Sequence, residues 1–186
     1  MLASTFFPTP VLYLSAVSAT ICLPIFALSI VNFGLLSIWL NAAVAVIIAV
    51  HHITLCAVTW ASRKRVQRSK VIIDDEESSP FHETDIEPPA AYSITNIVAL
   101  AFLVILNAIA FSIMVDITTR GAMKSTLPQE RVGSHKWNIK VEIGQSSVLG
   151  AELLVLSALL TVCALGRNRL IEEAKARKEE MEYDFW

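Results

Sequence analysis

Two adjacent histidines interrupt an otherwise apolar stretch, "AVHHITLCAV", which covers residues 49–58. Imidazole titrates near neutral pH, so these side chains are the first candidates for chemistry in the chain. At 100° per residue, His52 shares a helical stripe of small and polar residues with Asn41 and Cys56. His51 falls about 100° away, on a bulky aliphatic face. His52 is therefore predicted to point into a helical bundle, and His51 toward lipid or a helix seam.

Two more polar residues, Asn107 and Glu152, lie inside apolar segments. The helical rise places His52 roughly 14 Å, and the other two roughly 20 Å, from the polar ends of their helices. A carboxylate at such depth costs a few kcal/mol unless it is paired, hydrated or protonated. One hypothesis is that His52, Asn107 and Glu152 form a polar cluster that binds a cation or relays protons. The alternative is that these residues serve helix packing through interhelical hydrogen bonds.

Other chemistries lack a pattern in the sequence. Adjacent histidines cannot ligate opposite sides of one haem iron, and no Cys/His spacing supplies three or four zinc ligands. Gly-rich phosphate loops and hydrolase motifs are missing from the sequence. We therefore expect no catalytic residues, no cofactor and no metal, although an intramembrane enzyme built on Glu152 and His52 is conceivable in principle. We also expect no nucleic-acid partner.

The amino-acid composition indicates that these residues lie within a lipid bilayer. Of 186 residues, 54% are hydrophobic and only 17% charged, and the segment 1–62 has no Lys, Arg, Asp or Glu. Soluble domains carry about 25% charged residues. A cleaved signal peptide is disfavoured because "MLASTFFPTP" has no basic residue and the apolar run is too long. The prediction is an all-α integral membrane protein, a bundle of four transmembrane helices with a cytoplasmic linker and a helical C-terminal tail.

The charge pattern divides the chain into parts. We expect a transmembrane hairpin (1–62, helices about 10–31 and 36–61), a basic-then-acidic linker (63–93), a second transmembrane pair (94–165, helices about 94–115 and 146–165, with the non-cytoplasmic loop 116–145) and a tail (166–186). Within that loop, the alternation in "WNIKVEI" predicts a short strand. On the first helix, Ser15, Ser18 and Cys22 share one small, polar face.

Basic residues next to the helix ends predict the orientation. A cluster follows the second helix and consists of Arg63, Lys64, Arg65, Arg68 and Lys70. Both termini are therefore expected in the cytoplasm. The same cluster is a candidate contact for anionic lipids. Cys163 lies near the cytoplasmic boundary and is a candidate for lipidation, with a buried, inert thiol as the alternative.

These observations favour a non-enzymatic membrane organiser or adaptor that packs laterally and contacts lipid or a partner through its cytoplasmic parts. The alternative is a small oligomeric channel or a proton- or cation-coupled carrier that uses the Glu/His/Asn cluster. The bilayer is the certain partner of such a chain, and further copies of it or other membrane proteins are expected ones.

Overall fold

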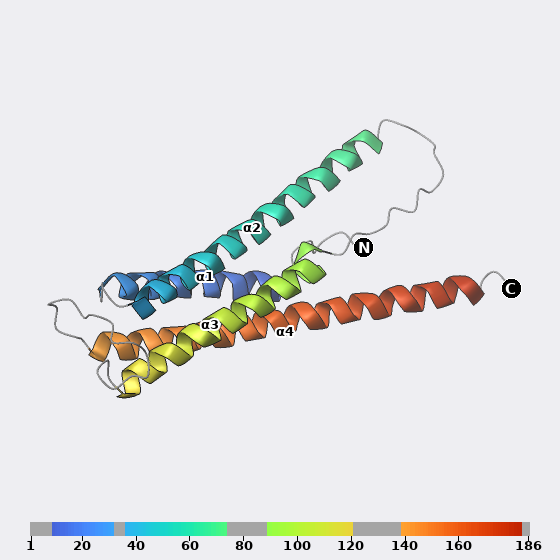
Figure 1. Ribbon diagram of the computed structural model, residues 1–186. Helices are drawn as coiled ribbons and strands as arrows, with labels where there is room; N and C mark the ends of the chain where they lie inside the picture. The colour runs from blue at the N-terminus through green and yellow to red at the C-terminus, as the bar shows by residue number, and fades with distance from the viewer. Residues whose placement is uncertain (1–8, 32–35, 74–88, 121–138, 184–186) are drawn as a thin grey trace.

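The computed structural model describes residues 9–31, 36–73, 89–120 and 139–183. In this part of the chain the architecture is all-helical, and every long helix has the length and hydropathy to span a membrane. The elements are α1 (Thr9–Val31), α2 (Leu36–Ile73), the short 3-10 helix η1 (Ala90–Tyr92), α3 (Ile94–Arg120) and α4 (Ile139–Tyr183). The predicted bundle of four transmembrane helices is confirmed (Figure 1).

The four long helices form an antiparallel bundle in which each contacts two neighbours. α1 packs on α2 and α4, and α3 packs on the same two helices, so α2 and α4 face each other across a diagonal. α2 and α4 also continue beyond the bundle at the same end and diverge there (Figure 1). We call this the arm end, and the opposite end, where α3 stops and α4 begins, the loop end.

Three helices are longer than predicted, and one of them, α3, continues past residue 115 to Arg120. α2 continues through the basic cluster to Ile73, and α4 begins at Ile139, inside the segment expected as a loop. The predicted strand is wrong for its residues 139–143, which are helical. Helical packing prevails there because Glu142 and Gln145 continue the buried stripe of α4. The predicted extension of the last transmembrane helix into the tail is confirmed as far as Tyr183.

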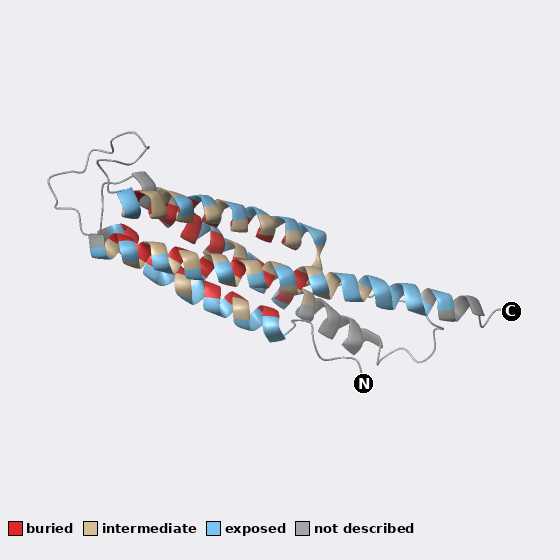
Figure 2. Ribbon diagram, turned by 90° about the horizontal axis from the view of Figure 1, so that it is seen from below, coloured by how far each residue is buried: buried red, intermediate tan, exposed pale blue. Residues whose placement is uncertain are grey.

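On α1, α3 and α4 the buried residues follow one another in alternating three- and four-residue steps. This spacing keeps one seam of each helix against its neighbours, as in left-handed bundles. On α1 the buried positions are Val11, Ser15, Ser18, Cys22, Ile25 and Ser29. On α4 they are Glu142, Gln145, Leu149, Glu152, Leu156, Leu159 and Cys163. Figure 2 shows these buried stripes facing inward on neighbouring helices.

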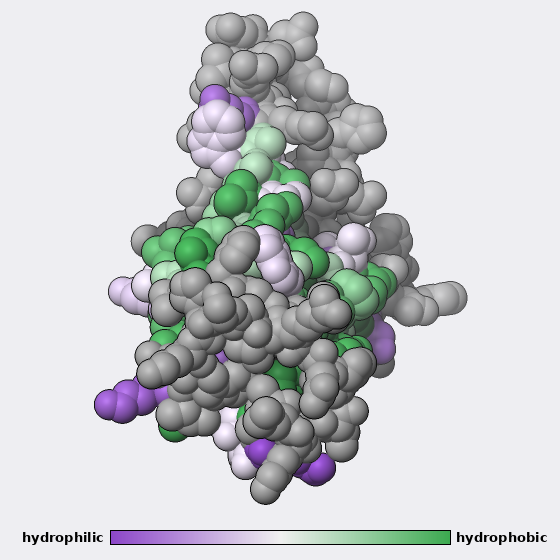
Figure 3. Space-filling view, turned by 60° about the vertical axis from the view of Figure 1, so that its left-hand side comes forward, coloured by the Kyte–Doolittle hydropathy of each residue, from purple (hydrophilic) through white to green (hydrophobic). Residues whose placement is uncertain are grey.

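Two exposed tryptophans of α2 indicate where the bundle meets the two membrane surfaces. Trp39 and Trp60 are 21 residues apart, which corresponds to about 32 Å of helix. That distance matches the hydrocarbon thickness of about 30 Å, and tryptophan favours both interfaces. The ammonium of Lys64 lies 3.6 Å from the Trp60 ring centroid, as expected for a basic side chain at the headgroup level. Hydrophobic side chains gather on the face between the charged ends (Figure 3).

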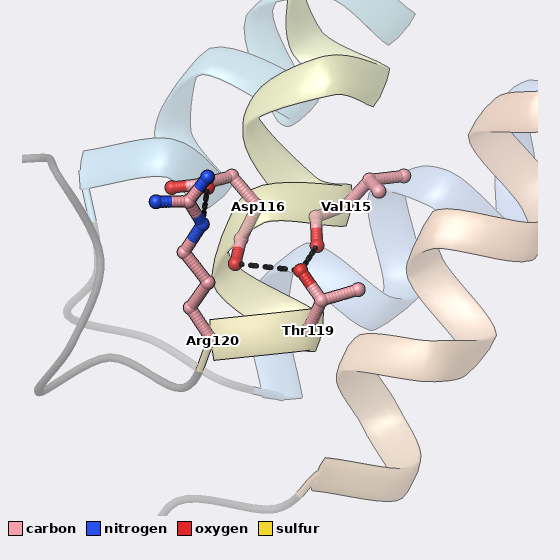
Figure 4. A network of polar contacts seen from close by, with 4 residues as sticks. All are labelled: Val115, Asp116, Thr119 and Arg120. Carbon is pink, nitrogen blue, oxygen red and sulfur yellow. Dashed lines mark hydrogen bonds and ion pairs between the residues drawn. The ribbon is translucent and has the colours of Figure 1, made fainter.

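Polar contacts stabilise the last described turn of α3 at the loop end. Arg120 forms an ion pair with Asp116 at 2.7 Å, and Thr119 Oγ1 donates to the carbonyl oxygen of Val115 (Figure 4). A basic residue at a helix C-terminus also complements the helix dipole. The apolar part of α3 therefore ends one turn before Arg120.

η1 attaches the start of α3 to α2 and α4 at the arm end. The Ser93 hydroxyl accepts a hydrogen bond from the Asn96 backbone N–H at 3.1 Å, a typical N-terminal cap. Arg167 donates to the carbonyl oxygen of Tyr92 at 3.3 Å. Burial, followed by the neighbouring Cys163, raises the pKa of the Tyr92 hydroxyl, while Arg169 opposes that shift. The phenol ring lies directly over Gly166. Glycine leaves room for the ring at this position because it has no side chain, whereas a Cβ would overlap the ring.

Gly166→Ala is expected to destabilise the contact between η1 and α4, because the added Cβ would overlap the Tyr92 ring. The expected cost is about 1–3 kcal/mol of unfolding free energy, as for other overpacked sites. A double-mutant cycle with Tyr92→Ala isolates this effect. In that background Gly166→Ala should be neutral or stabilising, since alanine is the better helix former. Equal effects in both backgrounds would show that the ring does not depend on this glycine.

Candidate functional site

The central feature of the bundle is a hydrogen-bonded triad of Ser18, His52 and Glu152. The Ser18 hydroxyl lies 2.8 Å from His52 Nε2 and donates to Glu152 Oε1. All three side chains are buried, and Glu152 is 0% exposed. The triad therefore joins a carboxyl group, a hydroxyl and an imidazole in one chain of hydrogen bonds inside the membrane-spanning region.

Three different helices supply the triad. Ser18 lies on the small, polar face of α1, and its short side chain allows α2 and α4 to approach α1 closely. His52 and Glu152 come from the diagonal pair α2 and α4, and α1 lies beside both. His52 precedes Trp60 by eight residues, so the triad lies about 12 Å from the arm-end interface and close to the middle of the membrane.

This geometry can hold a proton in two arrangements. In the first, imidazolium Nε2–H donates to the Ser18 oxygen, and the hydroxyl donates to the Glu152 carboxylate. In the second, a protonated Glu152 donates to Ser18, whose hydroxyl donates to a neutral imidazole. Reversing both hydrogen bonds moves one proton between His52 and Glu152 and exchanges an ion pair for a neutral pair. The neutral pair is favoured where charges are removed from water.

Each end of the triad also has a polar atom without a hydrogen-bond partner among the described residues. These atoms are Glu152 Oε2 and His52 Nδ1. A buried polar atom without a partner costs roughly 1–3 kcal/mol. The triad is thus an incomplete network in which two polar atoms are left without a partner among the described residues.

Asn107 lies outside this network. Its amide nitrogen donates to the carbonyl oxygen of Leu149 at 3.1 Å, and its Oδ1 has no partner in the described part of the chain. The structure therefore brings together two of the three residues of the predicted cluster, His52 and Glu152, and gives Asn107 a contact between α3 and α4. That contact agrees with the packing alternative for this residue.

His51 takes a different place from its neighbour. It is half-buried, and its ring meets the His52 ring edge-on with centroids 5.6 Å apart. The prediction that His52 is the inward-facing histidine agrees with its burial, with 4% of its surface exposed. His51 is thus less buried than His52, and its ring lies against the His52 ring.

The remaining predicted residues lie at or near the arm end. The backbone of α2 carries the whole basic cluster as a helical extension of the transmembrane segment. Among its members the structure describes the side chain of Lys64, while those of Arg63, Arg65, Arg68 and Lys70 lie outside the described residues. Cys163 is 0% exposed and accepts a weak contact from Asn96. Its burial favours the inert-thiol alternative over lipidation.

Sequence reasoning missed Ser18 as the link between His52 and Glu152. Ser18 lies on the small, polar face of α1, which could have indicated an inward-facing hydroxyl. Such faces are usually interpreted as surfaces for close helix packing. A second buried polar group at the loop end was also missed. There Gln145 donates to the Ser29 hydroxyl at 2.9 Å, which in turn donates to the carbonyl oxygen of Ile25.

These features define a multi-pass membrane protein, a four-helix bundle with a polar triad near its centre. Comparison of the chain with known protein families, curated proteins and solved structures found no match.

Proposed function

We propose that the protein is a non-enzymatic membrane organiser or adaptor, in which the bundle is the intramembrane body and the arms of α2 and α4 contact cytoplasmic partners or lipid. The observation that carries this proposal is the continuity of α4. It is one helix of 45 residues, from Ile139 in the bundle to Tyr183, and it is therefore about 68 Å long.

The surface of the α4 arm supports a docking role. Every residue from Ile171 to Arg177 is exposed. The segment contains two acidic and two basic side chains, together with one isoleucine and two alanines. Mixed charges of this kind confer specificity through charge complementarity with a partner. By the positive-inside rule the arms lie in the cytoplasm.

The α2 arm supports a contact with anionic lipid. The basic cluster follows Trp60 within one to three helical turns, and Lys64 already lies against the Trp60 ring. Basic residues next to a membrane surface contribute about 1 kcal/mol each to binding of anionic headgroups. Together, the two arms offer a lipid contact on one corner of the bundle and a protein contact on the opposite corner.

Site-specific photo-cross-linking in cells tests the adaptor proposal. We expect a photoreactive residue at Glu172 or Lys175 to capture a cytoplasmic protein, and deletion of residues 63–88 to alter the captured partner or the placement of the protein in the membrane. A photoreactive residue at Leu154, which is 74% exposed within the transmembrane part, is the matched control. The proposal fails if the arm positions capture only what Leu154 captures and the deletion changes neither partners nor placement.

The triad favours a second candidate, a proton- or cation-coupled carrier or channel. A buried carboxyl group with an imidazole in the same network is typical of intramembrane proton relays. In proteoliposomes, Glu152→Gln should lower a flux of protons or cations at least tenfold, because the amide keeps the shape of the side chain but cannot exchange a proton. Asn107→Leu, outside the triad, should retain most of the flux. A wild-type protein without measurable flux would exclude this candidate.

A further inference from the structure

A second polar layer lies at the loop end of the bundle, formed by Ser29 of α1, Asn41 of α2 and Gln145 of α4. These side chains are buried, with at most 4% of their surfaces exposed. Gln145 bonds to Ser29 directly. Glu142, also 0% exposed, lies one turn further toward the loop end on the same stripe of α4.

The register of the antiparallel helices places Asn41 in this layer. Ser29 follows Ser18 by eleven residues, and Asn41 precedes His52 by eleven. Since Ser18 contacts His52, equal steps in opposite directions bring Ser29 and Asn41 to the same level. The loop-end layer thus draws a hydroxyl from α1 and polar groups from α2 and α4, as the triad does, with a hydrogen bond between Ser29 and Gln145.

Several atoms in the loop-end layer require a partner that the described residues do not provide. Both polar atoms of the Asn41 side chain and Oε1 of Gln145 lack a hydrogen bond. Each such atom costs free energy in an apolar surrounding unless water satisfies it. Asn41 follows Trp39 by two residues. The layer therefore lies about 3 Å along the helix from the membrane–water interface at the loop end, where water can reach it.

The packing above and below the triad differs in character. Toward the loop end, several of the buried residues are small or polarisable: Cys22, Ala45, Ala110 and Met114, beside Ile25, Ile48 and Leu149. Toward the arm end, five leucines (Leu55, Leu100, Leu103, Leu156 and Leu159) and Val11 are buried together with Ser15, Thr59, Ala91, Asn96 and Cys163. Along α4, the step from Gln145 to Glu152 is seven residues, or about 10 Å. On the buried stripe of α4, the residues from Glu152 toward the loop end include the polar Gln145 and Glu142, whereas those toward the arm end are Leu156, Leu159 and Cys163. Water that enters from the loop end therefore finds hydrogen-bonding side chains on this helix.

We propose that the loop-end layer is a hydrated mouth through which Glu152 takes up a proton from the solution on the loop side. A hydronium ion gives its proton to the Glu152 carboxylate and remains as water, and release reverses this step. The titratable groups near Glu152 are Cys22 of α1 and His52 of α2, which Ser18 links to the carboxyl group. On α4 itself, Glu142 lies ten residues further toward the loop end. The inference uses the triad of the carrier candidate but requires neither transport nor the adaptor proposal.

Infrared difference spectroscopy on sealed vesicles with uniformly oriented, full-length protein tests this proposal. The carbonyl stretch of a protonated carboxyl group is followed while the pH is lowered on one side at a time. We expect a band that is absent in Glu152→Gln, present in Glu142→Gln, and raised by acid on the loop side only. A band that responds equally to acid on the arm side, or to acid on neither side, would overturn the proposal.

The mouth itself is tested by replacing its polar residues. Asn41→Leu with Gln145→Leu should slow the loop-side response of the Glu152 band at least tenfold, while Asn96→Leu, a buried polar residue at the arm end, should leave it unchanged. Should the double variant fail to fold, Asn41→Cys serves instead. A membrane-impermeant thiol reagent should label it from the loop side, whereas Leu156→Cys should stay unlabelled from either side. Protection of Asn41→Cys, or labelling of Leu156→Cys from the arm side, would contradict the hydrated mouth. Flux measurements are independent of both readouts, so a failure of the carrier candidate remains distinguishable.

Discussion

Ser18→Ala is expected to lower the stability of the bundle by about 2 kcal/mol, the largest effect of any single-atom deletion in its core. The substitution removes two interhelical hydrogen bonds at once. Such bonds average about 0.6 kcal/mol in membrane proteins and reach about 1.7. The loss also leaves His52 and Glu152 facing each other without their link, which adds a cost for unsatisfied buried groups. Reversible unfolding in mixed micelles, followed by circular dichroism, measures the change.

Asn107→Leu is the matched control for this prediction. It deletes one buried polar side chain at a contact between two helices and should cost less than about 1 kcal/mol. The triple variant Ser18→Ala, His52→Leu, Glu152→Leu should recover much of the loss, because an apolar replacement of a whole buried network is often neutral. The triad would be unimportant for stability if Ser18→Ala cost no more than Asn107→Leu.

A flexible insertion in the α4 arm is expected to abolish partner capture while leaving the bundle intact. Inserting Gly-Ser-Gly-Ser between Ile171 and Glu172 should reduce photo-cross-linking from Lys175 at least tenfold, because the arm would no longer share the orientation of the bundle. Inserting Ala-Glu-Ala-Lys at the same place should retain most of it. The two insertions have equal length and differ in stiffness, since the second is built of helix formers.

Distances between spin labels at Leu154 and Lys175 provide a readout that needs no partner. We expect a narrow distribution in the wild type, a narrow one about 6 Å longer with the helical insertion, and a broad one with the flexible insertion. Equal capture with both insertions would mean that the arm acts as a simple tether, and the adaptor proposal would lose its structural basis.

The helices were predictable because their apolar length and charge segregation are physical requirements of a bilayer. Their ends were less predictable. α2 continues to Ile73 and α4 begins at Ile139 because polar residues extend a helix into water or into a bundle as readily as apolar ones. The alternation around Val141 imitated a strand, yet the same residues fit the three- and four-residue steps of a buried helical stripe.

The candidate site was predictable in its polar residues and not in its connections. Helical periodicity placed His52 and Glu152 inward, but periodicity describes one helix at a time. Whether Glu152 meets α1 or α3 depends on the rotation and register of α4 against both neighbours. Those follow from the packing of small residues such as Ser18 and Gly150, the latter tight against Phe111. Asn107 shared the predicted depth of the cluster but faces the backbone of α4 at Leu149.

Because α2 and α4 lie on a diagonal of the bundle and carry the two arms, a force on the arms would be transmitted to the triad. Interaxial distances in packed bundles are about 8–10 Å, so the two arms leave the membrane at corners about 13 Å apart. The same two helices carry His52 and Glu152, and the Ser18 hydroxyl links these side chains through two hydrogen bonds. A force that spreads the arms would pull α2 and α4 apart and stretch the hydrogen bonds of Ser18 to His52 and Glu152. A force that draws the arms together would shorten these hydrogen bonds. Tension applied outside the membrane would thus act first on η1, which joins both helices at the arm end, and next on the hydrogen bonds between His52, Ser18 and Glu152.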